Sequence, residues 1–522
     1  VVGGGISGLT CALELRRAGA DVVLVERDAV CGGQSRSELV DGVHLCYSWR
    51  VFTTNYRNLL EIFSSIPTQT GGTVRDSLLP TGPYLTGASG ETFLTLFGIL
   101  LFDAPPELDA AERARIVERF VTLLGLCDER LHALEHMSFF DFIAPQGPFA
   151  AAYIDHIVGP FLGLEPRGAS VLCVVQMMQA VYANTKGLVP NAPYNVAIFD
   201  PWVAHLRALG VEVRTSTAVD RVAAHAVLLD TGEILEADRI ALCVDQWALA
   251  RLAHATPALG LHTAAEFAAK ASQLYYSFEL LLPMPVANLD LSIFAVKEVP
   301  WLPIVERWQN FFADARHVPG DAAEQWNVAI VDGIPYEGRT LAQTPPELAV
   351  EFTLRQMRES SMLRDLRLVD GTPLWSAPLH VRAWPYWRMD NGTLRNTQDQ
   401  YKICFNTGCF ALAPPMRTGL PSVFVGSVVA RHLPIVSQEA ACYNGRAAAR
   451  AMLGGSGVPL RSPPALLPLP PPVRVLDRAL LALGLPYLTL TERTFVLLNA
   501  LLLAALLLAA ETARRRLPSR LR

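Results

Sequence analysis

The sequence predicts an α/β fold in which a mixed α+β domain interrupts a Rossmann-type dinucleotide-binding domain, and a hydrophobic helix follows at the C-terminal end. Three observations lead to this prediction. The chain opens on a short apolar strand and a glycine turn, Val1-Val2-Gly3-Gly4-Gly5-Ile6-Ser7-Gly8. A second apolar strand over 21–25 ends in Glu26. A proline-rich stretch over 458–472 precedes an uncharged apolar run over 494–510.

The glycine turn fits the G-x-G-x-x-G pattern through Gly3, Gly5 and Gly8. The first glycine permits the tight turn, the second lets the backbone approach a pyrophosphate, and the third lets helix and strand pack closely. A helix is expected over 7–18. Its N-terminus, at Ile6 and Ser7, is expected to hold the pyrophosphate, because free N–H groups and the helix dipole favour negative charge.

The acidic residue that ends the second strand points to the nucleotide. Glu26 lies roughly 20 positions after the glycines, where a carboxylate holds a ribose hydroxyl. A carboxylate there disfavours a 2′-phosphate, so the sequence predicts the adenosine of FAD or NAD rather than that of NADP. The alternative, a glycine-rich turn in some other α/β protein, agrees less well with the helix and strand patterns on both sides of the turn.

The residues after Glu26 favour FAD. The run Gly32-Gly33-Gln34-Ser35-Arg36-Ser37 resembles the second flavin signature of the amine oxidase and phytoene desaturase superfamily, a Gly-Gly-Arg-x-x-Ser/Thr stretch. Gly32, Gly33 and Ser37 match that signature. Gln34 stands where arginine is common, and Arg36 is expected to contact the pyrophosphate in its place. The resemblance implies a FAD-binding domain and FAD as cofactor.

Two later segments are similar to the same superfamily. Residues 210–219 look like its returning strand, which implies that the backbone near Val219 meets the adenine. The strand that ends in Gly426-Ser427, with Glu439-Ala440 on the following helix, resembles the closing flavin motif. Ser427 replaces the usual acid, and its hydroxyl can still bond to the ribityl chain. The segment 48–56 looks more like the desaturase branch than the amine oxidase branch.

The resemblance implies a chain that crosses repeatedly between two domains. The FAD-binding domain is expected over 1–75, 191–260 and 395–455. The substrate domain is expected to supply helices over 76–190 and a sheet over 261–394. A proline-rich linker over 456–472 then leads to a membrane-associated tail over 473–522, which contains the hydrophobic helix 494–510.

Composition excludes several classes of function. A net charge of −5 gives no basic surplus, so no nucleic-acid partner is expected. The nine cysteines are scattered without C-x-x-C spacing, which indicates a reducing compartment.

His132-Ala133-Leu134-Glu135-His136 fits the H-x-x-E-H pattern of inverted zinc peptidases. The sequence offers no third ligand, so a solvated polar face of a helix is expected there, and no metal.

The tail predicts contact with lipid. The hydrophobic fraction of 51% and the mean hydropathy of +0.27 are high for a purely soluble enzyme. The run 494–510 lies at the lower length limit for a membrane-spanning helix, and arginines follow it. A tail anchor or in-plane insertion at an intracellular membrane is favoured over a buried core helix. The shorter apolar run Phe93–Phe102 could line a substrate tunnel, dip into the membrane surface or pack in the core.

Candidate catalytic residues are few, because a flavin itself accepts hydride and the protein supplies orientation and exclusion of water. By resemblance, Trp384, Tyr386 and Trp387 could form an aromatic wall over the flavin. Arg50 and His44 could supply an acid, a base or an anion contact. Simple packing is the alternative for the aromatic cluster, and a structural role is the alternative for Arg50 and His44.

Together these features predict a membrane-associated FAD-dependent oxidoreductase. It would remove a hydride from a C–H group of an apolar, isoprenoid-like small molecule and pass the electrons to a quinone or oxygen. Three alternatives remain. They are a tail-anchored amine oxidase that produces hydrogen peroxide, a flavin isomerase, and a flavin-free lipid carrier like the Rab GDP-dissociation inhibitors. Glu26, Gly32 and Gly33 argue against the carrier, whereas Ser427 argues slightly for it.

Overall fold

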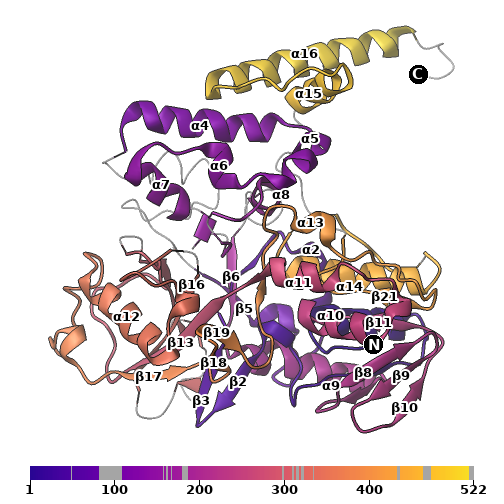
Figure 1. Ribbon diagram of the computed structural model, residues 1–522, viewed down its shortest axis with the longest axis vertical. Helices are drawn as coiled ribbons and strands as arrows, with labels where there is room; N and C mark the ends of the chain where they lie inside the picture. Colours follow the sequence, from indigo (N-terminus) through magenta and orange to yellow (C-terminus); the bar gives the residue numbers. More distant parts are fainter. Residues whose placement is uncertain are drawn as a thin grey trace.

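Two lobes lie side by side at one end of the computed structural model, a group of helices lies beyond them, and two C-terminal helices lie at the far end (Figure 1). The chain passes between the lobes several times, as the colours of Figure 1 show. The structure describes residues 1–48, 50–81, 108–156, 158–159, 163–165, 167–178, 186–296, 299–308, 311–312, 317–318, 322–332, 334–431, 435–455, 457–462 and 472–516.

The nucleotide-binding lobe is built on parallel strands. β1 (Val23–Val25) pairs with β7 (Glu212–Arg214), and β11 (Ile240–Leu242) pairs with β21 (Val423–Val425). Val2 joins the two pairs through parallel bridges to Val25 and Leu242. The expected first strand therefore lies at the centre of the sheet, and the glycine turn follows directly from the sheet's carboxyl edge, where open α/β sheets bind ligands.

Helices and an antiparallel sheet complete this lobe. The helix expected over 7–18 is α1 (Ile6–Arg17), which packs against α14 (Gln438–Met452). A three-stranded antiparallel sheet in the order β10-β9-β8 lies at its outer edge (Figure 1). The other elements are α2 (Arg57–Phe63), α9 (Asp200–Ala208), β8 (Val219–Ala223), β9 (Ala226–Leu229), β10 (Ile234–Glu236), α10 (Gln246–Ala255), α11 (Ala264–Ala271) and α13 (Cys409–Leu412).

The second lobe contains a five-stranded antiparallel sheet in the order β14-β15-β16-β13-β17. Its central strands, β13 (Tyr275–Leu282) and β16 (Glu324–Val331), are buried at every position, so both faces of the sheet are covered. The flanking strands are β14 (Ile293–Ala295), β15 (Ile304–Arg307) and β17 (His380–Ala383), and α12 (Pro346–Glu359) lies in the same lobe.

Short strand pairs connect the two lobes. They are β2 (Ser37–Val40) with β3 (Val43–Cys46), β12 (Ser272–Gln273) with β20 (Lys402–Ile403), and β18 (Trp387–Asp390) with β19 (Thr393–Asn396). A small sheet in the order β4-β6-β5 comprises β4 (Phe52–Thr53), β6 (Gly187–Pro190) and β5 (Leu78–Pro80). Along these strand pairs the chain passes the cavity that is described below.

The helical group matches the helical pattern expected before residue 190. α4 begins after Asp109, whose side chain accepts from the backbone N–H of Glu112 at 2.8 Å, a common N-cap arrangement. The apolar run Phe93–Phe102 lies outside the described residues. The helices of the group are α4 (Ala110–Gly125), α5 (Asp128–Ala133), α6 (Phe139–Ile143), α7 (Gly147–His156) and α8 (Val171–Met177).

The H-x-x-E-H segment is not a single solvated helix, which corrects the expectation. α5 ends at Ala133, and a 3₁₀ turn spans Leu134–His136. Glu135 is buried, and its Oε1 accepts from the backbone N–H of Ala411 at 2.7 Å. Among the described residues, no group of three or more His, Cys, Asp or Glu side chains could hold a metal ion.

The tail forms two helices, α15 (Pro472–Ala482) and α16 (Glu492–Arg516). α15 packs on α4, and its Asp477 forms an ion pair with Arg130 of α5 at 2.8 Å. α16 contains the hydrophobic run expected over 494–510. Within the described part of the chain, no helix is both long and apolar enough to cross a bilayer, so the expected spanning helix is not confirmed.

Candidate functional site

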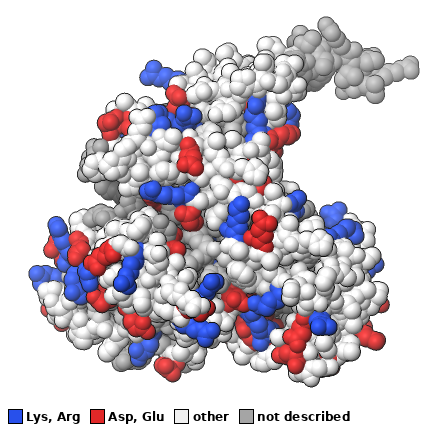
Figure 2. Space-filling model, in the orientation of Figure 1, with Lys and Arg blue, Asp and Glu red and all other residues white. Residues whose placement is uncertain are grey.

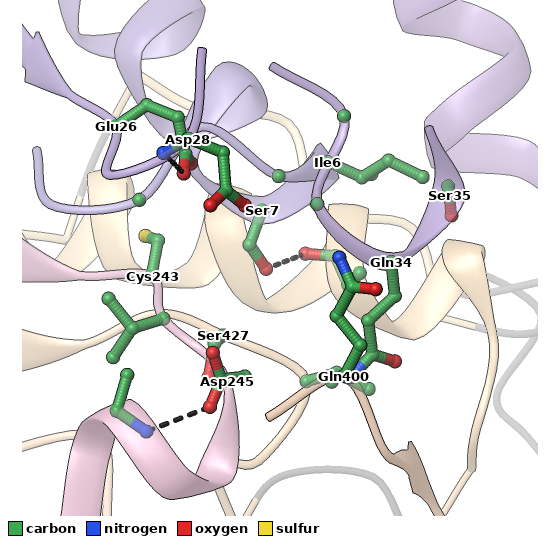
Figure 3. A pocket seen from close by; sticks show the side chains of 18 of the residues that line it. Ile6, Ser7, Glu26, Asp28, Gln34, Ser35, Cys243, Asp245, Gln400 and Ser427 are labelled. Atoms are coloured by element: carbon green, nitrogen blue, oxygen red, sulfur yellow. Dashed lines mark hydrogen bonds between the residues drawn. The ribbon is translucent and has the colours of Figure 1, made fainter. Parts of the chain in front are cut away.

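A cavity of about 560 Å³ lies at the carboxyl edge of the parallel sheet. Its volume is within the range typical of small-molecule and cofactor sites. Glu26, Asp28 and Ser7 lie on one side of it, and Asp245, Ser427 and Gln400 lie on the other (Figure 3). Of the residues expected to bind the cofactor, the wall includes Gly3, Gly5, Ile6, Ser7, Glu26, Gly32, Gly33, Arg36, Val219 and Ser427.

The glycines of the turn have three different surroundings. Gly3 has a φ of +100°, and a Cβ there would lie 2.5 Å from the carbonyl oxygen of Cys243. A Cβ at Gly8 would lie 1.8 Å from the carbonyl oxygen of Gly3, so Gly8 sets the close packing of helix and strand. A Cβ at Gly5 would meet only Gly33 Cα, at 3.7 Å. Gly5 and Gly33 therefore present bare backbone to the cavity.

The N-terminus of α1 opens onto the same cavity. Its N-cap is Gly5, and no side chain in the described structure caps it. Free N–H groups of the first turn, together with the helix dipole, make such an end a site for an anion such as a pyrophosphate. Ser7 donates from its Oγ to the carbonyl oxygen of Ala441 at 2.6 Å, which fixes α1 against α14.

Glu26 is held by two backbone donors. Its Oε2 accepts from the N–H of Gly4 at 2.5 Å. Its Oε1 accepts from the N–H of Asp28 at 2.8 Å (Figure 3). Burial raises the pKa of the Glu26 carboxyl, and these two hydrogen bonds oppose the rise. A carboxylate oxygen has two lone pairs, so Glu26 can still accept a hydrogen bond from a ribose hydroxyl.

Arg36 lies on the wall but is committed to neighbouring protein groups. Its guanidinium pairs with Glu38 at 2.5 Å and with Asp28 at 2.9 Å, and it donates to Gln398 Oε1 at 2.7 Å. The side chain is almost wholly buried. Two carboxylates therefore neutralise the charge of Arg36, which was expected to contact the pyrophosphate. In this structure Arg36 holds together the segments around Gly32 and Gly33.

Five of the residues that were expected to bind the cofactor do not line the cavity. Each of them has a structural role instead. Gly8 and Gly426 provide space for packing, since a Cβ at Gly426 would lie 2.8 Å from Ala448 Cβ. Ser37 exchanges hydrogen bonds with Asn195, at 2.9 and 3.0 Å. Glu439 accepts from the backbone N–H groups of Asn58 and Leu59 at the start of α2. Ala440 is buried beside it, and Gln438 and Ala441 line the cavity instead.

The inner end of the cavity holds residues that the sequence did not reveal. Tyr47 and Lys402 line it together with Arg50. Burial lowers the pKa of Lys402 to about 8. Within the described structure, the Tyr47 hydroxyl and Arg50 Nη1 find no hydrogen-bond partner, although both are buried. Arg50 was a candidate from the sequence, whereas neither a strand pattern nor any motif marks Tyr47 or Lys402, because these two converge only where the chain crosses between the lobes.

The remaining catalytic candidates lie behind the cavity wall rather than on it. Trp384 donates to Gln400 Oε1 at 2.9 Å, and Gln400 is the residue that lines the cavity. Tyr386 donates to Glu38, and Trp387 packs edge-on against Tyr401 with ring centroids 5.7 Å apart. These aromatic side chains thus form a packing cluster. His44 lies on β3, and its ring centroid is 5.9 Å from that of His317.

The arrangement fits a flavin dinucleotide. Bare glycine backbone and an uncapped helix N-terminus suit a pyrophosphate, and the buried Glu26 suits a ribose. The Val219 segment would hold the adenine end. The part of the cavity near Arg50 and Lys402 would hold the ring system, since among the described residues the Tyr47 hydroxyl and Arg50 Nη1 have no hydrogen-bond partner. A positively charged inner end also suits the negative charge that a flavin gains on reduction.

Comparisons with known proteins agree with this geometry. Residues 1–66 match the NAD(P)-binding Rossmann-like domain family. Hydroxyneurosporene desaturase from Rubrivivax gelatinosus is 31% identical over 178 residues, which span 33% of this chain and only 30% of that protein. Cyclohexylamine oxidase from Brevibacterium oxydans has a TM-score of 0.58 at 16% identity, covering 87% of this chain and 98% of that one.

A further solved structure shares the fold without sharing the kind of reaction. Reduced UDP-galactopyranose mutase has a TM-score of 0.56 at 14% identity, covering 87% of this chain and 95% of that one. At such identities the solved structures establish the fold alone. The fold therefore accommodates amine oxidases and a mutase, and the choice among chemistries rests on the site.

Proposed function

We propose that this chain, which belongs to the superfamily of FAD-dependent amine oxidases and phytoene desaturases, removes a hydride from a C–H group of an apolar, isoprenoid-like substrate. FAD is its cofactor. The observation that carries the proposal is the cavity itself. It is lined by the glycine turns and Glu26 and also by Tyr47, Arg50 and Lys402, which distant parts of the chain bring together.

When bound, FAD would supply the hydride acceptor, and the chain's own part would be to orient the substrate and to exclude water. Formation of a carbon–carbon double bond also releases a proton from the neighbouring carbon. Lys402, with a pKa of about 8, is the cavity residue best suited to exchange that proton near neutral pH. The desaturase relative supports the choice of substrate class. A quinone or oxygen would then receive the electrons.

The tail supports an apolar substrate and a membrane-associated location. On α16 the side chains of Leu497, Leu501, Leu507 and Leu508 are 58–70% exposed. Exposed apolar surface on this scale is unusual for a soluble monomer and is typical of interaction sites. We infer that α16 attaches the enzyme to an intracellular membrane, in which both a lipid substrate and a quinone would dissolve.

An amine oxidase is the second candidate, because solved amine oxidases share this fold over most of both chains. An amine oxidase would produce hydrogen peroxide when amines are added in air. A desaturase would instead show anaerobic bleaching of its flavin by a polyene. A flavin isomerase would show no net transfer of electrons to an acceptor. A flavin-free lipid carrier would be colourless.

An absorption spectrum of the detergent-purified protein tests the proposal first. Bands typical of flavin that bleach with dithionite are expected. Anaerobic addition of carotenoid-precursor polyenes should then bleach the same bands, and a quinone should restore them. A colourless protein that does not take up added FAD would overturn the enzyme proposal and leave the lipid carrier.

A further inference from the structure

Four arginines line the cavity, and they differ in whether a carboxylate neutralises them. Three of them form ion pairs, which are Arg27 with Asp28 and Asp245, Arg36 with Asp28 and Glu38, and Arg251 with Asp399. The fourth is Arg50. Among the described residues, no carboxylate forms an ion pair with Arg50, and its Nη1 has no hydrogen-bond partner. The charge of Arg50 is therefore the one that this part of the chain leaves unneutralised.

The guanidinium of Arg50 is nevertheless held in place. Its Nη2 donates to the carbonyl oxygen of Gln34. Its Cζ lies 5.4 Å from the centre of the Tyr194 ring, a cation–π contact, and the Tyr194 hydroxyl donates to the carbonyl oxygen of Arg50. Arg50 is only 9% exposed although it lines the cavity. The side chain is thus fixed from behind, with one end of the guanidinium left without a partner.

One carboxyl group lies close enough to Arg50 to sense its charge. The backbone N–H and the charge of Arg50 lower the pKa of Glu306, but burial outweighs them and holds that pKa well above its usual range. Glu306 has no exposed surface. Its carboxyl group therefore bears a proton at neutral pH and supplies no negative charge to balance Arg50.

A second cation strengthens the positive charge of this part of the cavity. Lys402 also lines the cavity. Burial, and to a smaller extent the charge of Arg50, lowers the pKa of Lys402 to about 8, so the amine still carries its proton at neutral pH. Buried charges in proteins are normally paired, because removing a charge from water is costly. A bound anion would relieve both the desolvation of Arg50 and its repulsion of Lys402.

The partner of Arg50 places this charge beside the second glycine pair. Gln34 directly follows Gly33, and a Cβ at Gly5, the N-cap of α1, would lie 3.7 Å from Gly33 Cα. Gln34 stands where the flavin signature commonly has arginine. Its own amide is turned to the carbonyl oxygen of Tyr401, to which Nε2 donates at 2.6 Å. Arg50 therefore brings a guanidinium, from outside the signature, to the turn where the signature lacks one.

We propose that Arg50 binds a negatively charged group of the cofactor in this cavity, in place of the arginine that the chain lacks at position 34. The assignment rests on the proposed function, because it takes FAD as the occupant. FAD carries negative charge at its pyrophosphate and, after reduction, at its ring system as well. A guanidinium with a free N–H suits either group through a charge-assisted hydrogen bond.

Titration of the apoprotein with FAD and with ADP tests the inference. FAD fluorescence reports binding, and ADP is measured by competition with FAD. If Arg50 holds the pyrophosphate, Arg50→Gln should weaken both ligands at least tenfold. If it holds the reduced ring, ADP should bind unchanged, and reduced FAD should lose at least tenfold more affinity than oxidised FAD. That difference lowers the reduction potential of bound FAD by about 30 mV, the equivalent of a factor of ten for a two-electron couple.

Further variants separate charge from packing. Arg50→Lys keeps the charge and should keep at least a third of the wild-type affinity. Arg382→Gln, which removes an exposed arginine of β17 outside the cavity, should leave binding unchanged. In urea, the apoprotein of Arg50→Gln should unfold at a concentration no lower than the wild-type protein, because the substitution removes a buried charge that lacks its counter-ion. A purely structural arginine would show the opposite.

Several results would overturn the inference. Unchanged affinities together with an unchanged reduction potential in Arg50→Gln would do so, as would equal losses in Arg50→Gln and Arg50→Lys. An Arg50→Gln apoprotein that is less stable than the wild type, or that does not fold, would identify Arg50 as a structural residue. A wild-type protein that takes up no FAD would contradict the proposed function itself, whereas the other results leave that function intact.

Discussion

Gly5 and Gly8 belong to one glycine turn, yet a methyl group would meet very different surroundings at the two positions. At Gly8 it would lie 1.8 Å from a backbone oxygen, whereas at Gly5 it would project toward the cavity with nothing nearer than 3.7 Å. We expect Gly8→Ala to lower the free energy of unfolding by about 3 kcal/mol, the upper part of the usual cost of overpacking. Urea unfolding of the apoprotein measures this loss.

Gly5→Ala should separate cofactor binding from stability. Because the backbone of Gly5 is extended, alanine can adopt its conformation, and the loss of glycine from the N-cap position should cost the apoprotein only about 1 kcal/mol. FAD binding should weaken at least tenfold, since the methyl group occupies the closest approach to the pyrophosphate. Fluorescence titration with FAD tests this. Unchanged FAD affinity in Gly5→Ala would place the dinucleotide outside this cavity.

Lys402 gives the site a pH dependence with a defined sign. Burial lowers its pKa from 10.5 to about 8, so between pH 8 and pH 10.5 the unfolded chain carries a proton that the folded chain lacks. Stability should therefore rise with pH across this window, and Lys402→Met should remove that contribution. Urea unfolding of the apoprotein at several pH values tests the slope. In the FAD-loaded protein, a flavin absorption change near pH 8 should disappear in the same variant.

Individual residues show how far the sequence predicts this site. The spacing of Gly3, Gly5 and Gly8 and the position of Glu26 predict cavity-facing backbone, because a short turn fixes its own geometry. Lys402 and Tyr47 could not be predicted, since they meet only when β20 and the segment after β3 are brought together across the lobes. Arg36 could be placed on the wall, but its neutralisation by Glu38 and Asp28 depends on partners that no motif specifies.

At the scale of elements, helical periodicity decides which residues of α14 reach the cofactor. Gln438 and Ala441 are three residues apart, lie on the same face and line the cavity. Glu439 points to the other side, where it accepts from two backbone N–H groups at the start of α2. The segment resembling the closing motif falls on β21 and α14, and the direction of each side chain around the helix was not predictable from the motif.

One buried carboxylate contributes strongly to the attachment of α15 to the helical group. Asp477 accepts from the backbone N–H of Cys127 at 2.9 Å and from Arg130 Nε at 2.8 Å. Asp477→Asn would leave the Arg130 charge largely buried without its counter-ion, which for a buried pair costs about 3–5 kcal/mol. We expect α15 and α16 to detach while the flavin spectrum stays unchanged. Faster hydrogen exchange confined to these helices measures the detachment.

A neighbouring ion pair provides the control for that experiment. Arg478 of α15 pairs with Glu129, but both side chains are more than half exposed. Exposed pairs contribute little to stability, so Arg478→Gln should leave hydrogen exchange in α15 close to that of the wild-type protein. If both variants loosen the tail equally, α15 is held by general charge attraction and not by the buried Asp477 carboxylate.

Charge is unevenly distributed over the face drawn in Figure 2. Lys, Arg, Asp and Glu side chains are scattered over the two lobes, whereas the described part of the C-terminal helices is mostly uncharged on this face (Figure 2). The apolar helix lies at the end of the long axis, away from the two lobes that form the cavity (Figure 1). A molecule so arranged can attach to a surface through one end while the cavity lobes stay clear of it.

Vesicle binding tests this arrangement. Leu501 and Leu507 are 58% and 63% exposed, and transfer of a leucine side chain from water into lipid contributes about 1.5–3 kcal/mol when complete. The protein should therefore float with phosphatidylcholine vesicles, and the double variant Leu501→Ser/Leu507→Ser should bind at least a hundredfold more weakly. Val369→Ser is the matched control, because Val369 is equally exposed, at 61%, but lies in the turn that follows α12. Equal flotation of wild type and double variant, or self-association through α16 without vesicle binding, would contradict a lipid-facing tail.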